Sequence, residues 1–430
     1  MTSKKNSKII RLIKEGGWIL IGQIAAIAGA LVSVRILTEY LSPAQYGHFA
    51  LGLSIAVMIN QLIFGGISNA IGRYFSIASE NGDLNGYKNA SLKLIIYSTV
   101  LVVILGIFFI IGLWVGDLKN WIDITVAALI FSIITGVVGS ISGLQNAARQ
   151  RAVVAFFSGL EAWLKISVAI LIMYWLGKSS TAVMIGYACA STLILALQII
   201  SLKKLVKISN IKYKENNKWI KKMLEYSLPF SIWGVFTAAQ QASDRWSLQK
   251  YGSTVDVGHY SVLFQVGYTP ISIITSLAIN FLGPILFQRS GDATDKGRNN
   301  DVQRITWIFT ITSIVITTIA FTLAMALHEW IFSWLVAFQY RVVSNLLPWM
   351  VLAGGLYASG QMLALKFMSD LKSSALTAPK ITTAIIGILL NIVGAVHAGI
   401  NGVVYALCVS SALYFIWTVC LVRKIEKKNE

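Results

Sequence analysis

The sequence predicts an all-α polytopic membrane protein of about twelve transmembrane helices, built as two six-helix lobes. Fifty-six per cent of the 430 residues are hydrophobic and only 13% are charged, and the mean hydropathy is +0.69. These values are too apolar for a soluble domain with a polar surface. Apolar stretches of about 20 residues, the length that crosses a bilayer, recur along the whole chain. An internal repeat, described below, relates the two lobes.

The apolar stretches define the domain organisation. In the first half we predict spans at 17–37, 48–70, 91–113, 121–143, 153–175 and 181–202. In the second half we predict spans at 227–249, 259–283, 305–327, 345–368, 380–398 and 401–422. The N-terminal lobe is therefore expected at 1–202, a basic cytoplasmic linker at 203–225, and the C-terminal lobe with a cytoplasmic tail at 226–430.

One connector is apolar but too short to span. The string "WIFSWLVAFQYR", between the ninth and tenth spans, is expected to form an outer interfacial helix. The basic residues before the first span lead into a segment of full spanning length without a small-residue cleavage site, so we expect this segment to be retained as a helix.

The distribution of basic residues indicates the topology. Of the 36 Lys and Arg residues, 28 lie in the segments that are inside if the N-terminus is inside, and four lie in outer loops. This asymmetry follows the positive-inside rule and places both termini in the cytoplasm. Topology and contact with anionic membrane lipids explain the net charge of +18, so a nucleic-acid partner is not expected.

A shift of 211 residues aligns the two halves. It pairs residues across a helix end, a turn and a whole further helix, over more than thirty positions. Because six helices return the chain to its starting side, the second copy has the orientation of the first. The repeat is therefore parallel, with a pseudo-twofold axis along the membrane normal, as in transporters whose lobes rock around a central site. The matched pairs are Leu37 with Leu248, Tyr40 with Tyr251, Ser42 with Ser253, Gly47 with Gly258, His48 with His259, Asn69 with Asn280 and Gly72 with Gly283.

These features carry a family resemblance. "RILTEYLSPAQYGHF" at 35–49, "SDRWSLQKYGSTVDVGHYSV" at 243–262, the basic linker and the twelve-helix count resemble the polysaccharide (O-antigen and capsule) flippases of the multidrug/oligosaccharidyl-lipid/polysaccharide exporter superfamily. The resemblance covers essentially the whole chain. It implies outward movement, across a bacterial inner membrane, of an oligosaccharide linked to undecaprenyl pyrophosphate. It further implies partnership with a polysaccharide polymerase and glycosyltransferases, and no cofactor.

Ionisable side chains within apolar spans are costly, about 2.5–3.5 kcal/mol each on insertion scales, so each requires a partner or a role. Lys165 is the deepest basic residue, and Glu161 precedes it by four positions on the same helix face. Either the two form a self-neutralising pair facing the bundle interior, or they line a central cavity. In the second case Lys165 would bind the pyrophosphate and Glu161 would titrate for ion coupling.

The seventh span carries a second polar set. In "TAAQQASDRWSL", Gln240 and Asp244 share one face, and Gln241 and Arg245 share the next. We expect this stretch to face the cavity between the lobes, with Arg245 drawn to the anionic headgroup and Asp244 anchoring it or exchanging protons. The alternative is that Arg245 extends to the outer interface as a helix-end anchor.

Other polar residues are weaker candidates. Arg35 is a further candidate for substrate binding or for an outer helix-end anchor. Asn60 and Gln61 are placed to hydrogen-bond the sugar or a neighbouring helix. Lys366 is expected to extend to the inner interface.

Two rival functions remain. The first is a cation- or proton-coupled small-molecule exporter of the same superfamily, which would need acidic residues facing its substrate. Within or at the ends of the spans there are more basic than acidic side chains, which favours an anionic substrate. The basic residues are Arg35, Lys165, Arg245 and Lys366, and the acidic ones are Glu161 and Asp244. A membrane polysaccharide polymerase or ligase would be expected to have a substantial outer loop. The chain has no HExxH motif and no paired CxxC, so we expect a transporter without a metal site, not an enzyme.

Overall fold

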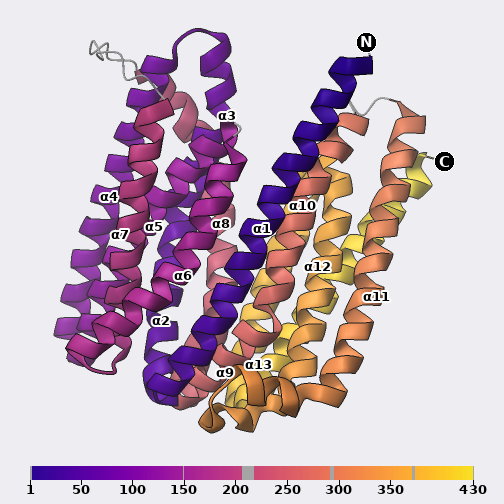
Figure 1. The fold of residues 1–430 in the computed structure, drawn as a ribbon. Coiled ribbons are helices and arrows are strands. Elements are labelled where there is room, and N and C mark those ends of the chain that lie inside the picture. Colours follow the sequence, from indigo (N-terminus) through magenta and orange to yellow (C-terminus); the bar gives the residue numbers. More distant parts are fainter. Residues whose placement is uncertain (1, 149, 206–216, 291–294, 370–372, 430) are drawn as a thin grey trace. The chain divides into compact units, whose positions relative to one another are not determined.

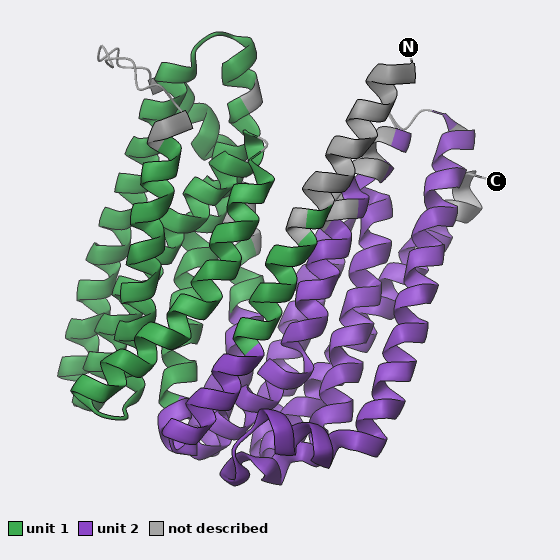
Figure 2. Ribbon diagram, in the orientation of Figure 1, with its two compact units in different colours: residues 1–30, 48–238 green, residues 31–47, 239–430 purple. Residues whose placement is uncertain are grey.

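The computed structural model describes residues 2–429, apart from 149, 206–216, 291–294 and 370–372. All the elements in the described part are helical (Figure 1). The chain divides into two compact units (Figure 2). Unit 1 comprises Met1–Ala30 and His48–Ala238, and unit 2 comprises Leu31–Gly47 and Ala239–Glu430.

Three helices contribute to both units: α1 (Thr2–Tyr40), α2 (Pro43–Ile59) and α8 (Asn217–Tyr251). The others of unit 1 are the π-helix η1 (Asn60–Phe64), α3 (Gly65–Glu80), α4 (Leu84–Val115), the 3-10 helix η2 (Lys119–Trp121), α5 (Ile122–Ala147), α6 (Arg151–Leu176) and α7 (Ser180–Leu205). Those of unit 2 are α9 (Thr254–Gly267), α10 (Thr269–Ser290), α11 (Lys296–Leu335), the 3-10 helix η3 (Phe338–Leu346), α12 (Leu347–Ser369), the 3-10 helix η4 (Ser373–Leu376) and α13 (Thr377–Asn429).

The described helices provide the predicted crossings. Nine of them are long and apolar enough to cross a membrane, or ten with the bent pair α9–α10. α13 crosses twice, because its apolar 48 residues would extend about 72 Å, more than twice the hydrocarbon thickness. It reverses at Gly399, whose φ is 54°, and the backbones of Gly394 and Gly402 meet beside the reversal. The nine spans, the bent pair α9–α10, the second crossing of α13 and α8, which is long enough to span, together make the twelve predicted crossings.

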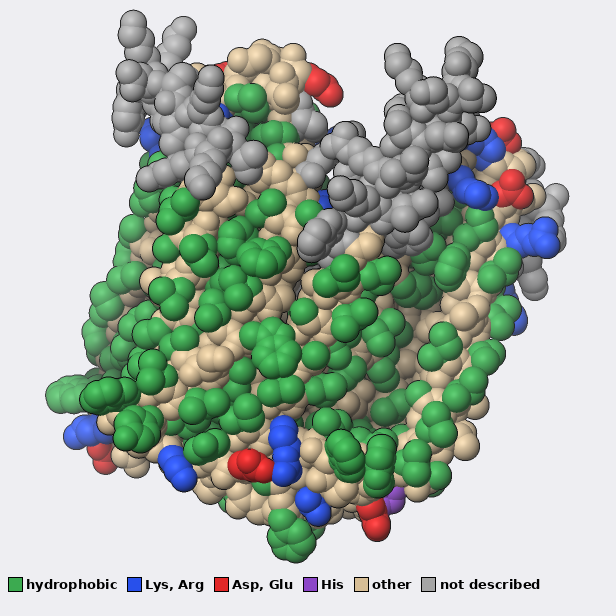
Figure 3. Space-filling view, in the orientation of Figure 1, with side chains coloured by type: hydrophobic (Ala, Val, Ile, Leu, Met, Phe, Trp, Pro, Cys, Tyr) green, Lys and Arg blue, Asp and Glu red, His purple; other side chains and the backbone are tan. Residues whose placement is uncertain are grey.

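The flanks of the helices suit a lipid environment. Large hydrophobic side chains are exposed along them, including Phe108 at 68% and Ile319 at 55%. On the face that Figure 3 shows, these side chains cover the flanks, and the described charged residues gather toward the helix ends. Because a soluble protein would not expose so large an apolar surface, the protein is a multi-pass membrane protein.

The repeat is visible in how α2 and α9 begin. The Ser42 hydroxyl accepts a hydrogen bond from the Gln45 backbone N–H at 3.4 Å, and Ser253, its partner in the 211-residue register, accepts from Asp256 N–H at 3.2 Å. Asp256 completes a capping box on Ser253. The serine that follows the first span of each half therefore begins the next helix by the same capping interaction.

Both of these helices are also interrupted at related positions. The first half has the π-helix η1 at Asn60–Phe64, and the second half bends by 40° where α9 meets α10. Pro270 follows this bend and has no backbone N–H to donate, which explains the break in the helix. The interruptions allow side chains in the middle of a span to leave the regular helical register.

The connector between α11 and α12 differs from the prediction. The expected separate interfacial helix is not formed: α11 continues to Leu335 and is followed by η3. The reason lies in the end of α1, whose last carbonyl groups lack intrahelical partners. Gln339 Nε2 donates to the carbonyls of Thr38 and Leu41 at 3.1 and 3.0 Å, and the Tyr340 hydroxyl donates to Leu41 at 2.8 Å.

The predicted linker is only partly described, because 206–216 lie outside the described residues. Residues 217–225 are helical and begin α8. Trp219 Nε1 donates a hydrogen bond to Asp83 Oδ2 at 2.7 Å, and Asp83 also caps α4 by accepting from Gly86 N–H at 3.1 Å. This contact fixes the start of α8 to the α3–α4 turn of unit 1. The division into lobes at 1–202 and 226–430 stays a prediction, since the compact units divide within α1, α2 and α8.

Candidate functional site

Glu161 and Lys165 form an ion pair inside unit 1. Both lie on α6, one helical turn apart, and the Lys165 Nζ to Glu161 Oε1 distance is 2.8 Å. The hydroxyl of Ser191 on α7, which is fully buried, donates to the same Glu161 oxygen at 2.9 Å. The carboxylate is therefore held by two donors from two helices, which offsets the cost of placing it within a span.

Aromatic rings surround the ammonium group of Lys165. Its Nζ lies 5.1 Å from the centre of the Phe131 ring and 5.9 Å from that of Tyr187. Tyr187 also contacts Phe49 of α2 edge to face, with centres 5.2 Å apart. The negative faces of aromatic rings attract a cation, so the position of Lys165 is determined by α2, α5, α6 and α7 together.

Asn60 and Gln61 lie in η1. Asn60 Nδ2 donates to Thr135 Oγ1 of α5 at 2.9 Å, which is the interhelical bond that the sequence left open as an alternative to sugar binding. A Cβ on Gly234 of α8 would come within 2.9 Å of the Gln61 carbonyl oxygen, so α8 packs closely against η1. A π-helix turns these two amides out of the register of α2 and α3.

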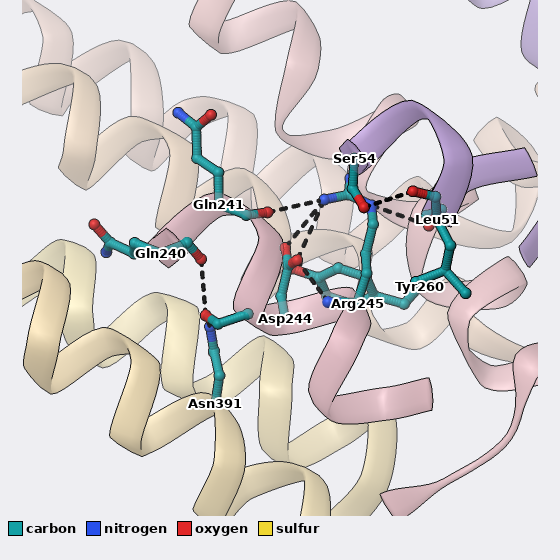
Figure 4. Close-up of polar contacts among 10 residues, drawn as sticks. Leu51, Ser54, Gln240, Gln241, Asp244, Arg245, Tyr260 and Asn391 are labelled. Atoms are coloured by element: carbon teal, nitrogen blue, oxygen red, sulfur yellow. Dashed lines mark hydrogen bonds and ion pairs between the residues drawn. The ribbon is translucent and has the colours of Figure 1, made fainter. Parts of the chain in front are cut away.

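Asp244 and Arg245 are the central charged residues of unit 2. Asp244, only 3% exposed, accepts from the Tyr260 hydroxyl at 2.7 Å and from the Arg245 backbone N–H at 2.6 Å (Figure 4). Arg245 Nη1 lies 3.3 Å from Asp244 Oδ1 and also donates to the Gln241 carbonyl at 3.3 Å. Both charges are therefore compensated within the unit.

The guanidinium of Arg245 also lies against α9. Its Nε donates to Ser261 Oγ at 3.3 Å, and its Cζ is 4.8 Å from the centre of the Phe264 ring. These contacts keep Arg245 within the helical bundle instead of extending to an interface. These contacts use Nε and Nη1, whereas a guanidinium carries five N–H donors.

Gln240, Gln241 and Asn391 lie beside this pair. The Gln240 side chain packs on Gly387 of α13, where a Cβ would lie 2.8 Å from Gln240 Nε2. Asn391 Nδ2 donates to Ser243 Oγ at 2.8 Å, and Ser243 in turn donates to the Gln240 carbonyl at 2.8 Å (Figure 4). Gln241 is exposed. The side of α8 that carries Gln240 is therefore packed against α13.

Arg35 has an acidic partner as well. Its Nη2 lies 2.5 Å from Oε1 of Glu39, one turn further along α1, and the two side chains are 37% and 49% exposed. Such an exposed pair contributes at most about 1 kcal/mol to stability. Nη1 of Arg35 is buried without a partner among the described residues.

Lys366 lies one turn before the end of α12, and its extension to the inner interface stays a prediction. Its side chain is 6% exposed, and its Nζ donates to the Asn299 carbonyl near the start of α11 at 3.0 Å. Close packing of α11 on α12 covers it.

The sequence was compared with known families and structures. Residues 12–290 match the family described as polysaccharide biosynthesis protein, which is more than half of the chain. The chain belongs to this family. The match confirms the resemblance predicted from the repeated helix-end strings. No curated protein matched the sequence.

Solved structures similar to this member of the polysaccharide biosynthesis protein family are membrane transporters. The lipid II flippase MurJ in an inward closed conformation has a TM-score of 0.69 and 14% identity, covering 96% of this chain and 87% of that one. An inward-facing multidrug resistance MATE family transporter of the MOP superfamily has a TM-score of 0.65 and 15% identity, covering 97% and 96%. A MATE transporter of Vibrio cholerae has a TM-score of 0.63 and 13% identity, covering 99% and 98%. These likenesses show that the chain shares the fold of these proteins.

Each of the three basic residues predicted as ligands in this family member has an acidic neighbour on its own helix. Lys165 pairs with Glu161, Arg245 with Asp244 and Arg35 with Glu39. An approaching anion would therefore compete with a carboxylate for the cation. Among the described residues, no group of three or more His, Cys, Asp and Glu side chains could hold a metal ion.

Several contact residues were missed from the sequence. Glu39 was overlooked although it lies four positions after Arg35. The aromatic residues of α9 were missed although Tyr260, Phe264 and Tyr268 recur every four positions. Ser191 and Asn391 lie 30 and 148 residues from their partners, so no local pattern could indicate them.

Proposed function

We propose that this protein is a flippase of the bacterial inner membrane that moves an oligosaccharide linked to undecaprenyl pyrophosphate from the inner to the outer leaflet. The family match over residues 12–290 carries the proposal, and the fold shared with the lipid II flippase MurJ supports it. A family of polysaccharide biosynthesis needs a step in which a lipid-linked sugar crosses the bilayer. Both termini would then be cytoplasmic, in agreement with the basic inner segments.

The mechanism that we propose is alternating access. The sugar and pyrophosphate would be exposed to one side of the membrane and then to the other, while the polyprenyl tail remains in lipid. Moving two negative charges outward along an inside-negative potential of about 100 mV would release about 4–5 kcal/mol. Translocation therefore has a driving force without ATP, and Glu161 and Asp244 remain the candidates for coupling to an ion.

In this proposal Arg245 binds the pyrophosphate. A phosphate oxygen would approach the guanidinium and compete with Asp244 for Nη1. The Tyr260 hydroxyl and the Arg245 backbone N–H would still donate hydrogen bonds to Asp244. The carboxylate therefore keeps two donors when the guanidinium also binds phosphate. Lys165 would bind phosphate in the same way, while the Ser191 hydroxyl keeps its hydrogen bond to Glu161.

Reconstitution tests the proposal. Purified protein in liposomes, given undecaprenyl-pyrophosphate-linked oligosaccharide on one leaflet, should move it to the other faster than protein-free liposomes, as followed by access of an added glycosidase. Arg245→Gln should slow this movement at least about tenfold, the cost of one charge-assisted bond. Wild-type protein that moves no lipid-linked sugar would contradict the proposed function.

The second candidate is a small-molecule exporter, which the MATE neighbours favour. The paired acids Glu161 and Asp244 would then bind a cation. Cells that express the protein and lack other pumps should in that case accumulate less of a cationic dye. Reduced accumulation of the dye, together with no movement of lipid-linked sugar, would replace the flippase by the exporter. A polymerase or ligase is the weaker alternative, because such an enzyme would be expected to have a substantial outer loop. Product formed by the purified protein from lipid-linked sugar would support it.

A further inference from the structure

A ladder of aromatic rings begins at Arg245 in unit 2. The Arg245 guanidinium lies over Phe264, and Phe264 stacks on Tyr268 with ring centres 4.6 Å apart and planes inclined by 20°. A Cβ on Gly354 of α12 would lie 3.4 Å from Cδ2 of Tyr268. Tyr357 lies one turn further along α12 and is 5.2 Å from Tyr414 of α13, centre to centre. The two ring pairs, Phe264 with Tyr268 and Tyr357 with Tyr414, are connected by the packing of Gly354 on the Tyr268 ring, and we call the four rings the ladder.

The sequence explains how these rings come together. Tyr268 occupies the bend between α9 and α10, which Pro270 causes. Gly354 has no side chain, so α12 can approach the Tyr268 ring closely. The ladder is therefore assembled by one kink and one glycine, not by a local sequence motif.

The tyrosine hydroxyls are unusual for a packed core. Tyr414 is 2% exposed and its hydroxyl has no hydrogen-bond partner among the described residues. The Tyr357 hydroxyl accepts from Gln361 Nε2 at 2.8 Å, and no described residue accepts its proton. A phenylalanine would fill each position without an unsatisfied hydroxyl, which is costly when buried. The described residues therefore leave hydrogen-bonding capacity unused at the Tyr414 hydroxyl and at the proton of Tyr357.

The depth of the tyrosines argues against a role as interface anchors. Tyr268, Tyr357 and Tyr414 lie roughly 10 to 15 residues from the start of α9, of α12 and of the second half of α13, or about 15–22 Å along each helix. This is near the middle of a hydrocarbon layer about 30 Å thick. Anchoring tyrosines lie at the interfaces instead.

We propose that Phe264, Tyr268, Tyr357 and Tyr414, with Gln361, form a sugar-binding surface that reads the pyranose rings of the transported lipid, beside Arg245, which holds its phosphate. This inference rests on the proposed function. The C–H face of a pyranose carries a slight positive charge and stacks on the negative face of an aromatic ring. The phenol hydroxyls and the Gln361 amide both donate and accept hydrogen bonds, as sugar hydroxyls require. Aromatic walls with a few polar groups are typical of small-ligand sites.

The charge at one end of the ladder decides between two ligand classes. Aromatic rings also bind organic cations, and an exporter of cationic drugs would use them in that way. Here the Arg245 guanidinium already occupies the Phe264 face, and a second cation beside it would be repelled. The arginine thus favours a ligand whose anionic end lies at Phe264 and whose neutral, hydroxylated end lies along Tyr268 and Tyr357.

Binding of two lipid probes tests the proposal. The first is bare undecaprenyl pyrophosphate, and the second is the same lipid carrying one glucose, galactose or N-acetylglucosamine. Affinities are measured with purified protein in nanodiscs, without any transport step. Wild-type protein should bind at least one sugar-bearing lipid about tenfold more tightly than the bare lipid, the effect of one or two hydrogen bonds together with stacking.

The variants separate sugar recognition from phosphate recognition. Tyr268→Phe, Tyr357→Phe and Tyr414→Phe remove only a hydroxyl and should keep the fold, and they should each reduce the preference for the sugar-bearing lipid about threefold or more while leaving affinity for the bare lipid unchanged. Arg245→Gln should lower the affinity for the bare lipid and for the sugar-bearing lipid by the same factor. Tyr405→Phe, on the exposed face of α13, is the matched control and should change neither affinity.

The outcomes distinguish this inference from the proposed function. Equal binding of bare and sugar-bearing lipid by the wild type, or an unchanged preference in the three tyrosine variants, would overturn the ladder and leave the flippase standing. Failure of the wild type to bind any of these lipids would overturn both. Tighter binding of a cationic dye than of either lipid, lost in Tyr268→Phe, would assign the ladder to an exporter.

Discussion

Gly47 and Gly258, which are equivalent in the 211-residue repeat, pack against each other at the start of α2 and α9. A Cβ on Gly47 would overlap the Thr254 carbonyl, and a Cβ on Gly258 would overlap the Pro43 carbonyl. Pro43 and Thr254 are themselves equivalent in the register. The contact is therefore reciprocal, each copy of the repeated string lying on the other. The chain repeats this string because its two copies form one self-complementary crossing, which requires a residue without a side chain in both.

The contact between α2 and α9 at Gly47 and Gly258 should not tolerate an added Cβ. Gly47→Ala and Gly258→Ala should each destabilise the protein by about 1–3 kcal/mol, the usual cost of overpacking, and lower its thermal unfolding temperature in detergent. Gly112→Ala on α4 is the matched control, because no atom lies within 4 Å of its added Cβ. The double variant should cost less than the sum of the two, since both carbons enter the same contact. Unfolding temperatures equal to that of Gly112→Ala would contradict the crossing.

The pair of Asp244 and Arg245 should show strong coupling. Asp244→Asn leaves Arg245 without its counter-charge, and removing one partner of a buried pair costs about 3–5 kcal/mol. Arg245→Gln likewise leaves Asp244 with an uncompensated charge. We expect the double variant to be more stable than the sum of the two single changes predicts, in a double-mutant cycle of thermal stability. Purely additive effects would mean that the two side chains do not interact.

The same design applies to Glu161 and Lys165 in unit 1. Glu161→Gln alone should destabilise the protein, because Lys165 then keeps only its aromatic neighbours and Ser191 loses a charged acceptor. Adding Lys165→Met should recover much of this loss, because a neutral pair of similar volume replaces a partly buried ion pair. Lys178→Met, at an exposed position in the connector between α6 and α7, is the control for the lysine change. A double variant no more stable than Glu161→Gln would contradict the ion pair as the structural role of Lys165.

The fold was largely predictable, because the signals that define it are local. Spans are read from continuous apolar runs, and the reversal at Gly399 falls in the two-residue gap predicted between the last two spans. The repeat was also recognisable, since Ser42 and Gly47 recur as Ser253 and Gly258. The interruption at η1 was not, because a π-helix depends on the packing of its neighbours and not on a distinctive composition.

The candidate site was predictable only in part. Lys165 with Glu161 and Arg245 with Asp244 followed from spacing along one helix. The ladder did not, because Tyr268 and Tyr357 are brought together by the folding of three helical segments. A single sequence contains the tyrosines but carries no signal that Gly354 of α12 packs on the Tyr268 ring.

The start of α8 provides a last prediction, on the contact between Trp219 and Asp83. The indole N–H donates to a carboxylate at 2.7 Å, and such charge-assisted bonds contribute about 1.5–3 kcal/mol. Trp219→Phe keeps the ring among Tyr74, Tyr87 and Met223 but removes the donor. The first turns of α8 should then open more often, so that trypsin cleaves after Lys218, Lys221 or Lys222 about tenfold faster or more, since local opening governs cleavage of a native protein.

Two comparisons make this experiment decisive. Asp83→Asn removes the charge of the acceptor but keeps an oxygen for the indole, and it should accelerate cleavage less than Trp219→Phe does. Trp334→Phe, an exposed tryptophan at the end of α11, should leave the cleavage rate unchanged. If Trp219→Phe is cleaved at the wild-type rate, the start of α8 is held by its apolar contacts alone. The hydrogen bond to Asp83 would then have no part in fixing α8 to the α3–α4 turn.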